Sequence, residues 1–376
     1  MARERRDVSP VAVHQLVPSI VPGDATAGHT LQLQRLLHDL GYDSEIYTLA
    51  VHRALEDRAR LIEELRGPTR ADRFLVYQCS AVSELADWII GRREQVAVDY
   101  HNITPPAFFR PWDPGIALSL LAGQVQVSQL APRVRVGICD SSFNASDLAG
   151  RGARATTVAP ILLDVRDFEA EPDPTTATVL ARRREEGGAQ WLFVGGIAPH
   201  KNQHRLVQAL ATYRRTHDRA ARLSLVGRPV SRSYDAALHH LVASLGLEDA
   251  VDLPGAVTDR ELAAYYRAAD VYVCLSLHEG FCVPLLEAMY HEVPVVAYGA
   301  GAVAETLGPG GVLLDDASPH VVATAVGRVL TDEAARTAFV NAGWSRLETF
   351  SLARTRSVMA DVVRRWVASE GQWTAP

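Results

Sequence analysis

Short apolar runs alternate with amphipathic stretches along almost the whole chain, and this rhythm predicts strands connected by helices. Apolar runs of about four to eight residues suit strands of a buried parallel sheet, and longer segments with helical spacing suit the helices that cover it. The alternation predicts an α/β protein with doubly wound sheets. The expected strands are 11–17, 44–49, 74–78, 96–100, 134–139, 156–163, 191–194, 222–226, 250–253, 271–275 and 294–297, and the expected helices of the first half are 28–40, 55–65, 83–91 and 117–129.

The polar segment 164–190 interrupts this rhythm. It contains Glu171-Pro172-Asp173-Pro174 and then a charged run with three arginines at 182–184. This composition is typical of a linker followed by an exposed helix, and 376 residues leave room for two domains of about 150–200 residues each. We therefore expect a first Rossmann-like domain at 1–170, a second at 171–351, and a last helix at about 352–376 that packs back on the first domain.

Composition excludes several classes of function. The net charge of −6 argues against nucleic-acid binding, which would need a basic face. Polar residues and prolines break the apolar N-terminal stretch, so we expect neither a signal peptide nor a membrane span. The arginines at 182–184 leave peripheral contact with anionic lipid open, although neighbouring glutamates favour a solvated face. We interpret the four widely spaced cysteines as reduced thiols of a cytoplasmic protein, namely Cys79, Cys139, Cys274 and Cys282.

The segment 276–289 carries candidate chemistry, because it follows the apolar run 271–275 and leads into a helix that is expected to begin at Pro284. Open α/β sheets place ligands at such carboxyl ends of strands. Free N–H groups at the helix N-terminus suit phosphate or sugar oxygens. The two carboxylates, Glu279 and Glu287, suit vicinal hydroxyls. A ligand that has both kinds of group is a nucleotide sugar.

A second turn, at 193–202, also joins an expected strand to an expected helix. It contains Gly195-Gly196 and Lys201, which is the only lysine among the 38 basic residues. Paired glycines let a backbone approach a phosphate, and a lysine supplies a compact cation for it. The alternative is a tight βα connection with a solvated lysine, and the neighbouring glutamate turn favours the phosphate interpretation.

These two turns, with nearly eighty residues between them, resemble the retaining glycosyltransferases of GT-B fold that are grouped as family four. The matching motif is Glu279-Gly280-Phe281 followed by Pro284-Leu285-Leu286-Glu287-Ala288. The resemblance implies two Rossmann-like domains facing each other across a cleft. It also implies roles by position: Glu287 for the ribose hydroxyls, Glu279 with the backbone N–H groups of Gly280, Phe281 and Cys282 for the donor sugar, Lys201 for the leaving diphosphate, and the backbone at Val257 for the base.

One departure concerns the cations that would face the diphosphate. The family usually carries an arginine directly after the glycine of the lysine turn, and this chain has Gly196 there. Arg228, which follows Gly227 at the end of the next expected strand, could replace it or could cap a surface loop. The departure leaves open a member with altered or weakened catalysis.

The first half offers three more candidates. The loop with Gly23 and Asp24 resembles the family's glycine-rich loop over the donor phosphates, and the alternative is an ordinary βα loop with a helix cap. His101 follows the expected strand 96–100, where the family commonly has a histidine that contacts the donor sugar. The aromatic segment 108–112 fits either an acceptor-sugar platform or a buried loop anchor.

Together these features predict a metal-independent hexosyltransferase, and the family resemblance implies that it retains the anomeric configuration. No His/Cys cluster has metal-ligand spacing, and we expect no cofactor besides the nucleoside-diphosphate sugar, which is the donor substrate. The acceptor would be a sugar, a lipid-linked saccharide or a small molecule. Two alternatives remain: a sugar-nucleotide epimerase of the same fold, and a non-catalytic nucleotide-sugar-binding subunit of a glycosylation complex.

Overall fold

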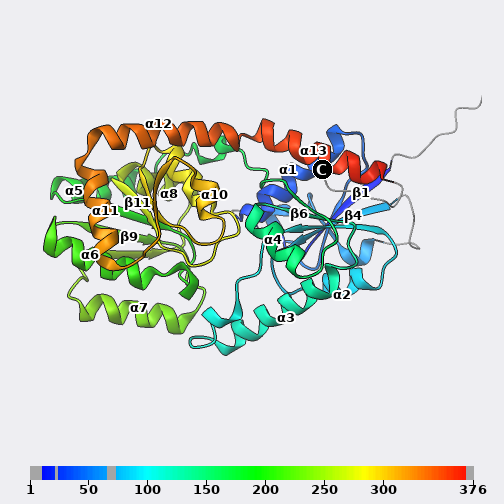
Figure 1. Ribbon diagram of the computed structural model, residues 1–376, viewed down its shortest axis with the longest axis horizontal. Helices are drawn as coiled ribbons and strands as arrows, with labels where there is room; N and C mark the ends of the chain where they lie inside the picture. The colour runs from blue at the N-terminus through cyan, green and yellow to red at the C-terminus, as the bar shows by residue number, and fades with distance from the viewer. Residues whose placement is uncertain (1–10, 22–23, 66–72, 370–376) are drawn as a thin grey trace, which may run out of the picture. The chain divides into compact units, whose positions relative to one another are not determined.

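The computed structural model describes residues 11–21, 24–65 and 73–369, which divide into two compact units, each built around its own parallel sheet (Figure 1). Unit 1 comprises the described residues within Met1–Ile103, Ala122–Leu163 and Ala353–Pro376. Unit 2 comprises Thr104–Leu121 and Asp164–Leu352. A segment from the first half of the chain therefore belongs to the second unit.

Unit 1 has a seven-stranded sheet in the order β3-β2-β1-β4-β5-β6-β7, with every pair parallel. Central strands such as β4 are buried along their whole length, as expected for a sheet covered on both faces. The strands are β1 (Ala12–Val17), β2 (Ile46–Thr48), β3 (Arg60–Leu61), β4 (Arg73–Cys79), β5 (Gln95–Tyr100), β6 (Val136–Cys139) and β7 (Thr156–Val158), and the helices include α1 (Ala25–Asp39), α2 (Glu84–Ile90), α4 (Ser142–Gly150) and α13 (Leu352–Ala368).

The last helix, α13, packs on the sheet of unit 1. Its apolar stripe is buried, and the Trp366 ring meets Phe74 of β4 edge to face at 5.2 Å. Arg356 pairs with Asp39 at the end of α1, with 2.5 Å between Nη2 and Oδ2. The chain thus returns to its first sheet after completing the second unit.

Unit 2 has a six-stranded sheet in the order β10-β9-β8-β11-β12-β13, again parallel throughout. The order reverses between β8 and β11, and open sheets bind ligands beside such switch points. The strands are β8 (Gln190–Val194), β9 (Arg222–Val226), β10 (Val251–Gly255), β11 (Val271–Cys274), β12 (Val295–Tyr298) and β13 (Gly311–Leu314). The helices include α5 (Pro174–Glu185), α6 (Gln203–Thr216), α7 (Arg232–Ser244), α8 (Asp259–Ala268), α9 (Val283–Tyr290), α10 (Val303–Leu307), α11 (Pro319–Thr331) and α12 (Glu333–Thr349), while α3 (Pro114–Leu130) runs from this unit into unit 1.

The predicted helix at 55–65 is wrong. This segment contains two short 3₁₀ turns around β3, and β3 pairs with the outer edge of β2. Its residues favour a helix, but propensity is a weak bias that backbone pairing to an open strand edge overrides. The predicted strand at 156–163 ends early, at Val158, and the short edge strands β3 and β13 were not predicted.

Two expectations from composition can be compared with the structure. All four cysteines are buried and free of disulfides. Among the helices of the described residues, none combines the length and the apolar character needed to cross a bilayer.

Candidate functional site

The backbone at the carboxyl ends of β8 and β9 comes unusually close together. Gly195 and Gly227 follow these strands with φ of +148° and +149°, values that side chains disfavour. A Cβ atom on Gly227 would lie 2.1 Å from the Gly195 carbonyl oxygen. The glycines therefore bring two turns into direct backbone contact and form the floor of a site.

A cavity of about 420 Å³ opens above this floor. It gathers five residues that the sequence singled out from three separate loops: Gly195, Gly196, Lys201, Arg228 and Val257. The remaining wall is largely apolar. An apolar cavity with a few convergent polar groups is the usual form of a small-molecule site.

Lys201 connects this cavity to the glutamate turn. Its ammonium donates a hydrogen bond to Glu279, with 2.7 Å between Nζ and Oε1. Burial lowers the pKa of Lys201, but the Glu279 carboxylate more than offsets this and raises the pKa above its ordinary value. The lysine is therefore a firmly charged cation at the cavity wall.

Asn202 joins the lysine turn to the end of β11. It has the left-handed φ of +62°, which asparagine tolerates better than most residues, and its side-chain amide donates to the Leu275 carbonyl at 3.0 Å. Leu277 N–H donates in turn to the His200 carbonyl at 2.7 Å. These bonds fix the turn that carries Lys201 against the segment that leads to Glu279.

The glutamate turn itself is held by the loop after β12 and by α10. Ala302 N–H donates to the Glu279 carbonyl at 2.9 Å, and the Thr306 hydroxyl donates to the Phe281 carbonyl at 2.6 Å. Cys282 ends the turn with φ of +75°. A left-handed residue here re-aims the chain into α9, which places Gly280, Phe281 and Cys282 together just before the helix N-terminus.

Glu287 lies apart from Glu279 and has another partner. The Tyr266 hydroxyl donates to its carboxylate at 2.6 Å. Burial raises the pKa of Glu287 to about 7, although the Tyr266 bond lowers it. Because α9 begins at Val283 rather than Pro284, Glu287 lies at the start of the second turn and not in the first. Glu287 is not among the residues that line the cavity.

Gly196, which stands where the family usually has an arginine, is tightly surrounded by other atoms. A Cβ atom on Gly196 would lie 2.9 Å from a methyl group of Val230, so a larger residue there would displace that side chain. Arg228 has an exposed side chain at the cavity wall. It forms no ion pair with the described residues.

The candidate site residues of unit 1 that the structure describes are bonded to other groups of the protein. Asp24 is the N-cap of α1, and its side chain accepts from Thr26 N–H at 3.0 Å. Gly23 lies outside the described residues. His101 is nearly buried, and both of its ring nitrogens face oxygen atoms of unit 1, Nδ1 facing Asp140 and Nε2 facing Gln78.

The aromatic segment at 108–112 belongs to unit 2. Phe109 is 1% exposed, and its ring lies 5.7 Å from that of His200. Trp112 packs edge to face on Tyr234 of α7 at 5.1 Å. The interpretation as a buried loop anchor is therefore correct for Phe109, while Trp112 is half-buried.

Sequence reasoning missed several residues that hold the site. Tyr266 lies on the buried face of the amphipathic helix α8, so helical periodicity could have pointed to it. Asn202 follows the lysine directly, but a left-handed conformation leaves no clear mark in one sequence. Gly301 allows the Glu279 carbonyl to pass, because a Cβ there would lie 2.4 Å from that oxygen.

In the described part of the chain, two groups of three side chains place potential metal-ligand atoms within 4.8 Å of one another. They are Cys274, Glu279 and Cys282, and His29, Asp99 and His101. In the first group Glu279 is already paired with Lys201. The neighbouring Cys274 sulfur and burial raise the pKa of the Cys282 thiol. A cation would therefore have to displace the lysine and a thiol proton.

Two Rossmann-like units with parallel sheets, one of them carrying this cavity, define the GT-B class of fold. The family model described as glycosyl transferases group 1 matches residues 181–346, which lie in unit 2. Two solved structures share the fold over nearly the whole chain. HepE from Anabaena, in complex with UDP and glucose, has a TM-score of 0.73 at 18% identity and covers 94% of this chain and 99% of its own. Sucrose-phosphate synthase from Thermosynechococcus elongatus has a TM-score of 0.72 at 20% identity, with 95% and 100% covered.

Curated relatives share more sequence over a shorter length. A D-inositol 3-phosphate glycosyltransferase of Kineococcus radiotolerans is 33% identical over 261 residues, which are 65% of this chain and 60% of the relative. A protein of the same name from Acidothermus cellulolyticus is 28% identical over 379 residues, which cover 86% of this chain and 83% of the relative. The chain thus spans about 60% of the length of the first of these relatives.

Proposed function

We propose that this protein is a glycosyltransferase that moves a hexosyl unit from a nucleoside-diphosphate sugar to an acceptor hydroxyl, with retention at the anomeric carbon and without a metal ion. The observation that carries the proposal is the cavity of unit 2, where a double-glycine floor, Lys201 and Arg228 surround one space beside a switch point of the sheet. Two cations and a glycine turn suit a diphosphate.

The donor would be held by groups with separate tasks. Lys201 has three N–H donors and gives one to Glu279, so two remain for diphosphate oxygens. Tyr266 occupies Oε2 of Glu287, and we assign Oε1 of that carboxylate to a ribose hydroxyl. Val257 also lines the cavity, and we assign its backbone to the base.

Catalysis would rest on charge stabilisation rather than on a protein base. As the bond to the anomeric carbon breaks, negative charge builds on the diphosphate, and the preorganised Lys201 ammonium stabilises it. A phosphate oxygen would accept the acceptor proton on the face from which the diphosphate departs, which gives retention. The family resemblance of the turns supports this mechanism.

The relatives suggest where to look for substrates. HepE has been crystallised with UDP-glucose, which favours uridine nucleotides as the first donors to test. The relatives named D-inositol 3-phosphate glycosyltransferases favour a polyol phosphate as the first acceptor. We assign donor binding to unit 2 and acceptor recognition to unit 1, and we place the protein in the cytoplasm because its four thiols are free.

The experiment is a two-stage panel with the full chain. UDP-, GDP- and ADP-sugars are scored by ligand-induced thermal shift, and the stabilising donor is then combined with D-inositol 3-phosphate, a lipid-linked saccharide and simple sugars while nucleoside diphosphate release is followed. We expect transfer with the donor's anomeric configuration, unchanged by a metal chelator.

Three outcomes would contradict the proposal. An epimerised donor formed without any acceptor would indicate an epimerase. Donor binding with no turnover on every acceptor would indicate a non-catalytic subunit, for which Gly196 is the one sequence hint. Inversion of the anomeric centre in the product would refute the retaining mechanism.

A further inference from the structure

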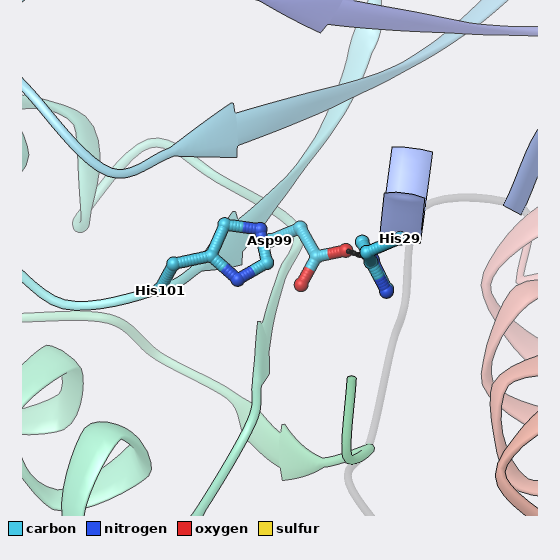
Figure 2. Close-up of side chains that lie close together, drawn as sticks. All are labelled: His29, Asp99 and His101. Carbon is cyan, nitrogen blue, oxygen red and sulfur yellow. Dashed lines mark hydrogen bonds and ion pairs between the residues drawn. The ribbon is translucent and has the colours of Figure 1, made fainter. Parts of the chain in front are cut away.

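A buried polar cluster lies at the carboxyl edge of the unit 1 sheet. Figure 2 shows Asp99, from the end of β5, between the rings of His29 and His101. His29 comes from α1, and His101 follows β5 directly. Asp99 is fully buried and His29 is 1% exposed. Three titratable side chains taken out of water need a defined arrangement of protons, because an unpaired charge there is costly.

The proton positions on one side of His101 follow from a chain of amides. Gln15 donates its Nε2–H to the Thr30 carbonyl at 2.9 Å, so its oxygen is free to accept. Gln78 Nε2 donates to that oxygen at 3.1 Å and to Asp99 at 3.4 Å. The oxygen of Gln78 must then face His101 Nε2, which is 2.6 Å away. An amide oxygen only accepts, so His101 Nε2 carries a proton.

The other ring nitrogen of His101 faces a carboxylate. Nδ1 lies 2.8 Å from Asp140 Oδ2, and Asp140 is itself 4% exposed. A proton on Nδ1 gives an imidazolium paired with an anion, which is the stronger form of such a bond. Burial lowers the pKa of His101, but Asp140, followed by Asp99 and Asp24, more than offsets this and raises the pKa to about 9.

His29 differs from His101 in its protonation state. Its Nδ1 accepts the Leu162 backbone N–H at 2.8 Å and therefore carries a lone pair. Its proton is then on Nε2, which donates to Asp99 Oδ2 at 2.8 Å. His29 is thus a neutral imidazole. This arrangement also opposes a metal ion in the cluster, because His29 Nε2 and both nitrogens of His101 carry protons where a metal would need lone pairs.

We propose that Asp140 is a positioning residue that holds His101 as an imidazolium, and that Asp99 and Gln78 fix the orientation of the same ring. His101 is then a fixed cation with no lone pair, so it cannot serve as a general base at neutral pH. The catalytic meaning of this charge rests on the proposed function and on the donor-sugar role that the family resemblance implies for His101; the protonation states themselves do not.

Besides the neutral amide of Gln78, the titratable groups described around His101 are few. They are Asp140 after β6, Asp99 on β5, Asp24 at the N-cap of α1, and the ring of His29, which lies edge to face at 5.3 Å between centroids. Among them Asp140 alone forms an ion pair with His101 in the described structure. Asp140 is therefore the side chain to change.

Asp140→Asn is an isosteric test. An asparagine can donate its amide N–H to His101 Nδ1, and a neutral ring protonated on Nε2 would still donate to Gln78. The variant keeps the hydrogen bonds and removes the charge. Asp147→Asn is the matched control, because Asp147 is a nearby carboxylate bonded to Tyr100 and Arg151 instead.

The readout is the long-range ¹H–¹⁵N spectrum of histidine-labelled full-length protein, with the His101 and His29 signals assigned by His101→Gln and His29→Gln. At pH 7 we expect two protonated nitrogens for His101 and one, Nε2, for His29. In Asp140→Asn the His101 signals should become those of a neutral ring, and in Asp147→Asn they should not move. If Asp140→Asn fails to fold, titration of the unmodified protein still decides, since His101 should stay charged up to a pH near 9.

One unprotonated His101 nitrogen at pH 7 in the unmodified protein would overturn the proposal, and so would zinc-induced shifts of both histidines at one equivalent. An activity measurement separates this inference from the proposed function. The ratio of kcat/KM for Asp140→Asn to that for the unmodified enzyme should fall about 25-fold from pH 6 to pH 8, because His101 of the variant loses its proton with a pKa near its ordinary value of about 6.5. Taking the ratio cancels titrations that both proteins share, such as that of Glu287. If no donor is turned over, the proposed function fails while the spectra still test the proton arrangement.

Discussion

Each unit places a cation beside a carboxylate at the carboxyl edge of a parallel sheet, but the two cations differ in what they leave free. Lys201 gives one hydrogen bond to Glu279 and lines a cavity of about 420 Å³. His101 faces acceptors with both of its nitrogens. An ammonium has three donors and an imidazolium two. The same edge of a sheet can therefore present a cation to a ligand or hold it within the protein.

The largest expected effect comes from a substitution in the glycine floor of the Lys201 cavity. Gly227→Ala would force a Cβ against the Gly195 carbonyl at a φ of +149°. Overpacking and backbone strain should together lower the free energy of unfolding by about 2–6 kcal/mol. Gly246→Ala is the control, because its φ is +64° and nothing lies within 4 Å. Chemical denaturation compares them, and equal losses would mean that the two turns do not touch.

The next effect concerns the histidine side of the comparison. The raised pKa of His101, about 9 against an ordinary value near 6.5, gives stability that is full below pH 6.5 and is lost as pH rises through 9. The expected loss is about 3 kcal/mol, from about 1.4 kcal/mol for each pKa unit. Denaturation at pH 6.5 and pH 9.5 measures it. Asp140→Asn should lose much less over this interval, and parallel losses in both proteins would contradict the ion pair.

Removing the cation that lines the cavity, Lys201, should affect activity more than stability. A charge-assisted hydrogen bond contributes about 1.5–3 kcal/mol, so Lys201→Ala should lower kcat/KM by roughly 10- to 150-fold on the true donor. Arg205→Ala removes an exposed cation from the next helix and should have no such effect. Full activity of Lys201→Ala would exclude the phosphate role.

The smallest effect tests Glu287. Its pKa of about 7 means that its carboxyl group is mostly protonated at pH 6 and mostly ionised at pH 8. If the carboxylate binds ribose hydroxyls, nucleoside diphosphate affinity should rise about 10-fold over this interval, because binding must first remove the proton. Calorimetry at both values measures the rise. In Glu287→Gln the affinity should be weaker and should lack this rise, and an unchanged affinity would remove the ribose assignment.

Much of the fold could be predicted from local pattern. The run 222–226 is β9, and the runs at 74–78 and 271–275 lie within a residue of β4 and β11. Buried strands leave continuous apolar stretches that a single sequence shows. The segment 55–65 failed because its pairing partner, the edge of β2, is distant in sequence and leaves no local signal.

The candidate site also has a part that the sequence predicted and a part that it did not. Gly195, Gly196, Lys201, Arg228 and Val257 were visible as residues that follow strands, and the structure gathers them around one cavity. The partners of these residues were not visible. Tyr266 of α8 lies beside Glu287 of α9, and Asp140 after β6 lies beside His101 after β5. Only tertiary packing brings each of these pairs together.

The sequence by itself determined which residues stand at the carboxyl ends of strands, because strand ends and turn glycines are properties of short segments. Tertiary structure alone decided what each of these residues does with its hydrogen bonds. Whether a cation keeps free donors depends on the acceptors around it, and those acceptors come from distant parts of the chain. For that reason Lys201 and His101, which look alike as candidates in the sequence, differ in the folded protein: one lines a cavity and the other is locked between two acceptors.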